Sequence, residues 1–171
     1  MTGFERLWNG WRSSYVSSLG PTDEATSQSG SVFTQILRSG VSDADANIVH
    51  RGEHVFAILN AYPYGTGHML ILPYREVPNL EDLDAEEAAE LWSTVTDAVR
   101  AVKGAYLPDG VNVGANLGRP AGGSVSEHLH IHVVPRWTGD ANFMTAVANT
   151  RTLPEPLEDT ARQLRAAWPV S

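Results

Sequence analysis

The sequence predicts an α+β fold in which an antiparallel sheet of about five strands is covered by one long helix. Three observations predict it. Short apolar segments with a two-residue period follow one another with brief turns between them, as in sequential antiparallel strands. One long segment, residues 84–104, has helical spacing instead. Shorter helical patterns near both ends add an N-terminal and a C-terminal helix.

The predicted strands are bounded by turn-forming residues. They span residues 47–50, 54–59, 68–72, 110–115 and 127–134. Arg51-Gly52-Glu53 joins the first two as a hairpin-like turn, residues 61–67 form a Pro/Gly loop, and Pro73 ends the third strand.

The predicted helices span residues 4–19, 32–37, 84–104 and 157–168. Glu87 lies three residues after Asp84, a capping-box pair that begins the long helix. Lys103-Gly104 ends it. Its expected buried residues are Ala88, Leu91, Trp92, Val95, Ala98, Val99 and Val102.

A length of 171 residues fits one structural domain. Within it we distinguish an N-terminal helix with a flexible connector (residues 1–30), the main domain (31–145) and a C-terminal helical extension packed on that domain (146–171). The chain contains no cysteine, which excludes disulfides, thiolate nucleophiles, iron–sulfur clusters and thiolate zinc sites.

The formal net charge of −8, with no run of Lys or Arg, argues against nucleic acid and anionic membranes as partners. No apolar run approaches the ~18 residues of a membrane span, and the first residues do not resemble a signal peptide. We therefore expect a cytoplasmic protein.

The segment His128-Leu129-His130-Ile131-His132 carries the chemistry. Alternate residues of a strand share a face, so the strand prediction points the three histidines the same way. Neutral imidazole is a general base and a nucleophile toward phosphorus. A row of surface histidines is one alternative. A metal site is another, but no nearby carboxylate completes a ligand set, so we expect no metal.

A Gly-rich turn, residues 114–124, leads into this segment. Glycines let a polyphosphate approach backbone N–H groups, and Ser124 adds a hydroxyl donor. The turn lacks the Lys-Ser/Thr ending of a Walker motif. Arg119 and Arg136 flank the segment and are either ligands for distal phosphates or solvated loop residues.

Residues 128–134 match the complete signature of the histidine triad (HIT) family, and the sequence resembles that family over residues 31–145. The longer string N-x-G-x-N-x-G, A-G-G-S and H-x-H-x-H-V-V-P-R-W is similar to the actinobacterial branch associated with diadenosine tetraphosphate phosphorylase activity. Two positions depart from other branches. Ser31 and Thr34 stand where many members carry a Cys-x-x-Cys pair that sometimes binds zinc, and Ser124 replaces a glutamine.

The resemblance implies a HIT-like fold and a role for each matching residue. His130 would be the nucleophile at the α-phosphorus, His132 would contact the α-phosphate, His128 would fix the tautomer of its neighbours, and His68 would orient them. The implied substrate-binding residues are Phe33 over the base, Asn60 near the ribose, Asn116, Gly123 and Ser124 at the phosphates or leaving group, and Trp137.

The implied reaction is phosphate-dependent cleavage of diadenosine tetraphosphate to ADP and ATP through a nucleotidyl-histidine. The alternatives are a hydrolase that releases AMP from dinucleoside polyphosphates or nucleotide phosphoramidates, and a catalytically weak nucleotide-binding protein. No tightly bound cofactor is expected, and Mg²⁺ would at most accompany the nucleotide. The resemblance also implies a homodimer or higher homo-oligomer.

Overall fold

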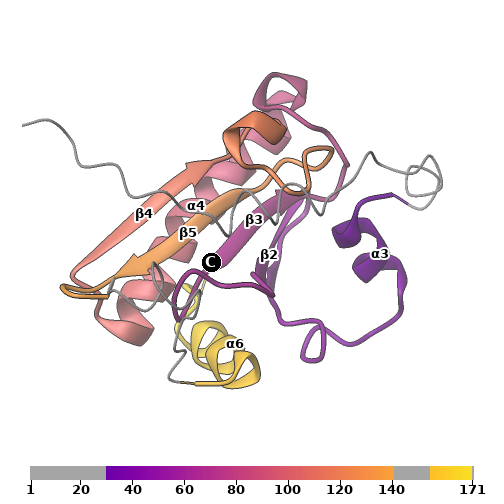
Figure 1. The fold of residues 1–171 in the computed structure, drawn as a ribbon. Coiled ribbons are helices and arrows are strands. Elements are labelled where there is room, and N and C mark those ends of the chain that lie inside the picture. The colour runs from indigo at the N-terminus through magenta and orange to yellow at the C-terminus, as the bar shows by residue number, and fades with distance from the viewer. Residues whose placement is uncertain (1–29, 141–154, 171) are drawn as a thin grey trace, which may run out of the picture.

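A computed structural model describes residues 30–140 and 155–170 of the chain. Its single sheet has the order β1-β2-β3-β5-β4, and every neighbouring pair is antiparallel (Figure 1). The strands are β1 (Ile48–Arg51), β2 (Val55–Leu59), β3 (Met69–Pro73), β4 (Gly110–Ala115) and β5 (Ile131–Arg136). The predicted α+β class and five-stranded antiparallel sheet are confirmed.

The long helix is α4 (Ala85–Tyr106), and it begins as predicted. The Asp84 carboxylate accepts the Glu87 N–H at 2.8 Å, and the Glu87 carboxylate accepts the Asp84 N–H at 3.0 Å. The predicted end at Gly104 is wrong, because the helix continues to Tyr106 and stops at Leu107, which has a left-handed backbone (φ 48°). A glycine within an exposed helix costs only ~1 kcal/mol, too little to end α4 against its packing on the sheet.

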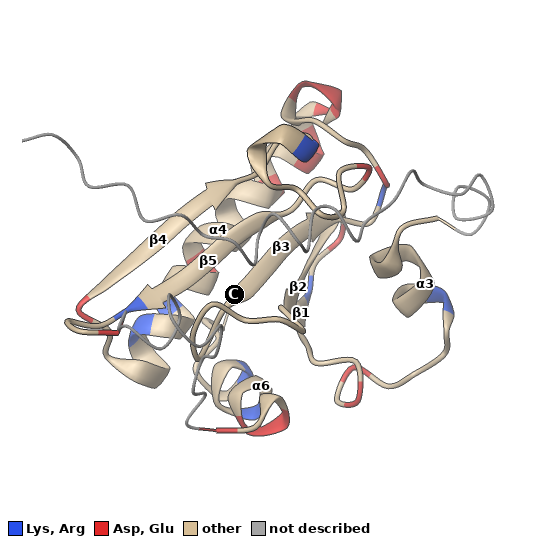
Figure 2. Ribbon diagram, in the orientation of Figure 1, with Lys and Arg blue, Asp and Glu red and all other residues tan. Residues whose placement is uncertain are grey.

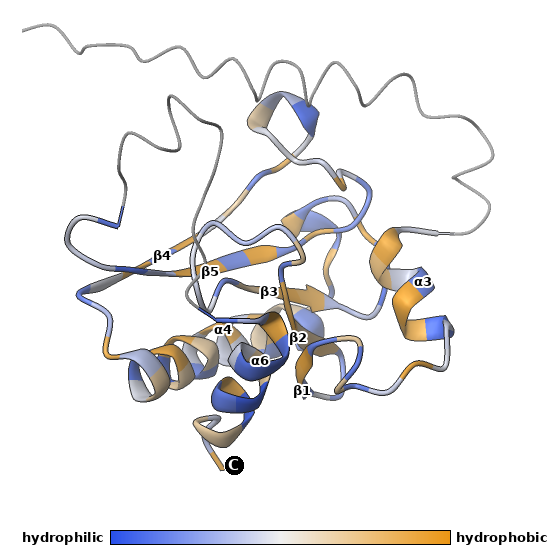
Figure 3. Ribbon diagram, turned by 60° about the horizontal axis from the view of Figure 1, so that its bottom comes forward, coloured by the Kyte–Doolittle hydropathy of each residue, from blue (hydrophilic) through white to orange (hydrophobic). Residues whose placement is uncertain are grey.

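One face of the sheet packs against α4 (Figure 1). Leu91, Val95, Ala98 and Val102 are buried there, and apolar bands alternate with polar ones along the helix (Figure 3). Trp92 was predicted to be buried and is 50% exposed. It follows Leu91 by one residue, a turn of about 100° that carries it off the buried stripe.

The other face of the sheet carries α3 (Val32–Arg38), the short helix predicted over residues 32–37. Phe33 is its buried residue, and it packs in a second apolar cluster. The buried members of that cluster from the sheet are Ile48, Phe56, Ile58, Leu70 and Leu72. This face of the sheet therefore brings α3 toward the region where the histidines lie.

The C-terminal helix is α6 (Leu157–Ala166), two residues shorter than predicted. It packs against α4 and β1. Trp168 stacks on His50 with ring centroids 4.7 Å apart, and Arg165 donates to the carbonyl oxygens of Ile48 and Asp43. The predicted helix over residues 4–19, with Trp8 and Trp11, lies outside the described residues.

Two 3₁₀ helices complete the described structure: η1 (Leu80–Asp82) and η2 (Arg119–Ala121). Acidic residues gather around η1 and the first turn of α4, whereas the sheet carries few charges (Figure 2). None of the helices within residues 30–140 and 155–170 is long and apolar enough to cross a membrane.

Candidate active site

The three histidines lie where β5 begins rather than along one strand. Because β5 starts at Ile131, only His132 belongs to it, and the predicted strand over 127–134 is wrong at its start. The pairings of β5 with both neighbours stop at Ile131, so the preceding residues have no strand partner. Leu129 instead donates its N–H to the Val77 carbonyl at 2.7 Å.

The imidazole rings nevertheless gather into one cluster. The centroids of His130 and His132 are 5.0 Å apart. Phe33 packs edge-on against His128 at 5.6 Å and tilts against His130 at 5.7 Å. The aromatic residue expected at the substrate base therefore lies beside the expected nucleophile.

The hydrogen bond of His130 identifies its free nitrogen. Nδ1 lies 2.8 Å from the carbonyl oxygen of His128, which can only accept, so Nδ1 carries the proton. Burial lowers the pKa of His130 below the usual histidine range, so the ring is neutral at pH 7. The lone pair is therefore on Nε2, where a nucleophile toward phosphorus needs it.

Hydrogen bonds also determine the tautomers of His68 and His132. The Tyr64 N–H donates to His68 Nδ1 at 3.0 Å, so the proton of a neutral His68 is on Nε2. Nε2 of His68 lies 2.9 Å from Nδ1 of His132 and donates to it, which leaves the His132 proton on Nε2. Burial and the adjacent His130 lower the pKa of His132 to about 4. His68, predicted to orient the triad, does contact it.

His128 is held at both ring nitrogens. Nε2 donates to the Pro73 carbonyl at 2.8 Å, and Nδ1 accepts from the Ser31 hydroxyl at 2.7 Å. Burial lowers the pKa of His128 as well. The predicted influence of this residue on its neighbour's tautomer operates through its main-chain carbonyl.

The Gly-rich turn closes tightly beside this cluster. A Cβ on Gly123 would lie 2.9 Å from the Asn116 carbonyl oxygen and 3.2 Å from that of Gly118. Contacts this close between a Cβ and the backbone are not tolerated, so a glycine is required there. Gly123 is buried, whereas Ser124 is exposed at the end of the turn.

Two asparagines border the histidines. The Asn116 side-chain amide lies 3.4 Å from Nε2 of His132, and that of Asn60 lies 3.4 Å from Nδ1 of His68. Nε2 of His132 carries a proton and therefore needs an acceptor. A half-turn of the Asn116 side-chain amide, which exchanges its nitrogen and oxygen, places the amide oxygen toward the ring as that acceptor. Both predicted asparagines therefore lie at the histidine cluster.

Trp137 and Arg136 lie elsewhere. Both follow His132 toward the opposite end of β5, and five residues of strand span roughly 17 Å. The Arg136 guanidinium donates to Asp140 at 2.6 Å and to Asn112 at 2.8 Å. The structure thus separates Trp137 from the other predicted site residues.

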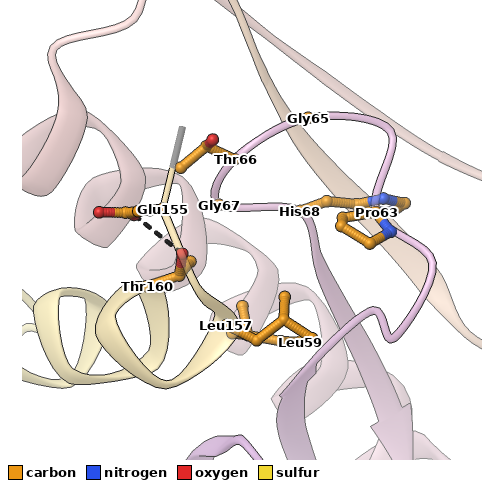
Figure 4. A pocket seen from close by; sticks show the side chains of 9 residues that line it. All are labelled: Leu59, Pro63, Gly65, Thr66, Gly67, His68, Glu155, Leu157 and Thr160. Carbon is orange, nitrogen blue, oxygen red and sulfur yellow. Dashed lines mark hydrogen bonds between the residues drawn. The ribbon is translucent and has the colours of Figure 1, made fainter. Parts of the chain in front are cut away.

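A small hollow lies beside the loop that leads to His68 (Figure 4). The nine residues that line it are Leu59, Pro63, Gly65, Thr66, Gly67, His68, Glu155, Leu157 and Thr160. Thr160 donates to the Glu155 carboxylate at 2.8 Å, and the Tyr106 hydroxyl donates to the same carboxylate. Of the four site histidines, His68 alone lines the hollow, so the hollow adjoins His68 and not the triad.

Four residues at the site were missed or assigned no role by sequence reasoning: Tyr64, Ser31, Thr34 and Glu76. Tyr64 contributes its backbone N–H, which no side-chain pattern reveals. The helix-capping pattern of Ser31 could have been read, because its hydroxyl accepts the Thr34 N–H. Its contact with His128, 97 positions away, could not.

Zinc does not fit the positions where related proteins carry a Cys-x-x-Cys pair. Ser31 and Thr34 supply hydroxyls in place of thiolates, and the Ser31 hydroxyl already bonds His128. Throughout residues 30–140 and 155–170, no cluster of three or more His, Cys, Asp or Glu is arranged to hold a metal ion.

The fold and the site together define a class: an α+β protein with a cluster of buried, neutral histidines beside a Gly-rich turn. The sequence model of the HIT domain matches residues 41–139. The chain belongs to the HIT family.

Two relatives and two solved structures show the range of similarity. An AP-4-A phosphorylase from Mycobacterium tuberculosis is 44% identical over 96% of this chain and 84% of its own length. A bis(5'-adenosyl)-triphosphatase from Dictyostelium discoideum is 38% identical over 47% of this chain and 54% of its own length.

Among solved structures, a Hit-like protein of Bartonella henselae involved in cell-cycle regulation has a TM-score of 0.66 and 30% identity, covering 80% of this chain and 95% of that one. A zinc-bound histidine triad protein of Mycobacterium smegmatis has a TM-score of 0.65 and 32% identity, covering 80% and 91%. Both confirm the HIT-like fold.

Proposed function

We propose that this protein is a nucleotidyltransferase that cleaves diadenosine tetraphosphate, with inorganic phosphate as the acceptor, to ADP and ATP. The observation that carries the proposal is the hydrogen bond from His130 Nδ1 to the His128 carbonyl at 2.8 Å. It leaves the Nε2 lone pair of a neutral imidazole free for attack. The 44% identity to an AP-4-A phosphorylase supports this choice of substrate.

In the first step, Nε2 of His130 attacks the α-phosphorus and forms a P–N bond, while the bond to the bridging oxygen breaks and ATP leaves. The ring becomes an imidazolium whose Nδ1–H still donates to the His128 carbonyl, and that hydrogen bond strengthens as the charge develops. In the second step, an oxygen of inorganic phosphate attacks the same phosphorus and the P–N bond breaks. ADP is released, and His130 is neutral again.

Other residues stabilise the charge that moves between the phosphates. The N–H at Nε2 of His132, whose ring is oriented by His68, would donate to a phosphate oxygen of the bound substrate in place of its long 3.4 Å contact with the Asn116 amide. The turn closed by Gly123 contributes backbone N–H groups, and Ser124 contributes a hydroxyl. Phosphoryl transfer depends mainly on such positioning, and Mg²⁺ would enter only with the nucleotide.

The products identify the acceptor. Incubation of the protein with diadenosine tetraphosphate should give ADP and ATP in equal amounts when phosphate is present. Release of AMP at the same rate without phosphate would instead establish the hydrolase, and binding without turnover across several polyphosphate lengths would establish the nucleotide-binding alternative. Isotope-labelled phosphate should appear in ADP alone.

We further propose that the protein is a homodimer paired along β4. This strand is at an edge of the sheet, and its middle residues Asn112, Val113 and Gly114 are exposed. Antiparallel pairing of two copies would set the Gly110 end of one beside the Ala115 end of the other, which directs Trp137 toward the partner's Gly-rich turn.

Light scattering tests the dimer. The wild-type protein should have twice the mass of its chain, and Val113→Lys should reduce this mass to that of a monomer because a charged residue opposes strand pairing at an edge. A monomeric wild-type protein would overturn the dimer. The cytoplasmic location remains a prediction, which cell fractionation tests.

A further inference from the structure

The segment that contains His128 and His130 has little backbone support of its own. It precedes β5, so no ladder of strand hydrogen bonds runs through it. The peptide that carries the His128 carbonyl is held by one main-chain hydrogen bond, from the Leu129 N–H to the Val77 carbonyl at 2.7 Å. The side chain of His128 supplies the missing support, because its ring is bonded at both nitrogens and lies against Phe33.

One of these two ring contacts comes from outside the region matched by the HIT domain model. Ser31 precedes residue 41, where that match begins, and only 2% of it is exposed. Since His128 Nε2 donates to the Pro73 carbonyl, its Nδ1 must accept, and the Ser31 hydroxyl at 2.7 Å is the donor.

Ser31 is itself held in place by a small network. Its backbone N–H donates to the Glu76 carboxylate at 2.7 Å, and the Thr34 hydroxyl donates to the same oxygen at 2.7 Å. Its own hydroxyl oxygen accepts the Thr34 N–H at 3.2 Å and lies 3.2 Å from the Thr34 hydroxyl oxygen. The Ser31 hydroxyl proton goes to His128 Nδ1, which is nearer, at 2.7 Å, and requires a donor. Partial burial opposes ionisation of Glu76, but these hydrogen bonds prevail and lower the pKa of its carboxyl, so it is a charged acceptor at pH 7.

We propose that Ser31, held by Thr34 and Glu76, is a positioning residue for the nucleophile: its hydroxyl fixes the tautomer and place of His128, whose carbonyl in turn keeps the His130 lone pair on Nε2. This inference rests on the proposed nucleotidyl transfer for its kinetic consequence. The tautomers themselves do not depend on the substrate.

The test is Ser31→Ala, which removes the donor to His128. We expect kcat to fall about 10- to 100-fold while KM changes little, because the misplaced nucleophile affects the chemical step more than binding. In ¹⁵N NMR of the substrate-free protein, the ring nitrogens of His128 and His130 should shift toward a mixture of tautomers.

The matched control is Ser39→Ala. Ser39 ends the same helix, α3, and its hydroxyl donates to the Ile36 carbonyl at 2.7 Å without contacting a histidine. It should cost similar stability and leave kcat and the histidine spectra unchanged. Equal losses of kcat in the two variants would show that Ser31 acts only by capping α3, and would overturn the proposal.

The wild-type spectrum provides a test that needs no variant. The proposal requires a protonated Nε2 and an unprotonated Nδ1 on His128, with the reverse on His130. The opposite pattern on either ring would overturn it even if Ser31→Ala failed to fold. If the protein does not cleave dinucleoside polyphosphates but the tautomers are as stated, the proposed function fails and the positioning by Ser31 stands.

Discussion

His68 donates through Nε2 to Nδ1 of His132 across 2.9 Å, although 64 positions separate the two residues in the sequence. The bond arises because His68 immediately precedes β3, and β3 pairs with β5 so that Leu70 lies opposite His132. The direction of the bond follows from the Tyr64 N–H on the other side of His68. A backbone amide therefore determines which nitrogen of His132 carries the proton.

The first prediction concerns the nucleophile. His130→Ala should lower turnover of diadenosine tetraphosphate by a factor on the order of 10³ or more and leave nucleotide binding measurable, since the residue forms the covalent bond. Denaturing mass spectrometry of wild-type protein with substrate but no phosphate should show one added nucleotidyl group, absent in the variant. His54→Ala, on the β1–β2 turn, serves as the control. Full activity of His130→Ala would refute the mechanism.

A second prediction concerns the orientation of His132. His68→Leu removes both the donor to His132 and the acceptor of the Tyr64 N–H, so we expect kcat to fall on the order of 100-fold or more because the His132 tautomer is no longer fixed. His68→Gln keeps a donor and an acceptor on one side chain and should retain more of the rate. A His68→Leu protein that is folded and as active as His68→Gln would disprove this role of the Tyr64–His68–His132 hydrogen bonds.

The third prediction is a dependence of stability on pH. Burial lowers the pKa values of His128, His130 and His132 below the ordinary histidine value of 6.5, that of His132 to about 4. Below pH 6.5 the unfolded chain therefore binds protons that the folded protein does not, and the free energy of unfolding falls as the pH falls. For His132 the loss spans the interval from 6.5 to about 4.

Urea unfolding at several pH values across that interval measures the effect. His132→Gln removes one of the three groups, so its unfolding free energy should decline less steeply than that of the wild-type protein. Identical slopes would show that His132 is not held neutral by the fold. More than about one pH unit above 6.5, where the unfolded histidines are also neutral, both proteins should be insensitive to histidine titration.

The fourth prediction tests the turn. Gly123→Ala would place a Cβ 2.9 Å from the Asn116 carbonyl oxygen, so the turn must shift; we expect a cost of ~1–3 kcal/mol in unfolding free energy and a loss of activity through Asn116. Gly104→Ala is the control. Gly104 lies within α4, and a Cβ there would have an ordinary 3.7 Å contact with Ala167. The substitution should therefore stabilise the protein by ~0.5–1 kcal/mol, because alanine has the higher helix propensity. A gain in stability for both would contradict the tight closure.

The site could be predicted only in part. The H-x-H-x-H spacing and the Gly-rich turn indicated histidine chemistry and a phosphate site, and Phe33, Asn60 and Asn116, which the family resemblance implied, do lie at the histidines. The placement of all three histidines on one strand was wrong because a strand needs a neighbour, and β3 and β4 have none to offer before Ile131. The burial of Trp92 was wrong because apolar character alone does not place a residue on the buried stripe.

The sequence by itself determined the elements and the reactive residue types, because helical and strand periods, the Asp84 cap and the triad spacing are local properties of the chain. Only the tertiary structure decided what each histidine nitrogen does. Protons on imidazole rings are assigned by their hydrogen-bond partners, and those partners, the Tyr64 amide, the Pro73 carbonyl and the Ser31 hydroxyl, come from other elements of the fold. Contacts between such distant residues exist only once the sheet has formed.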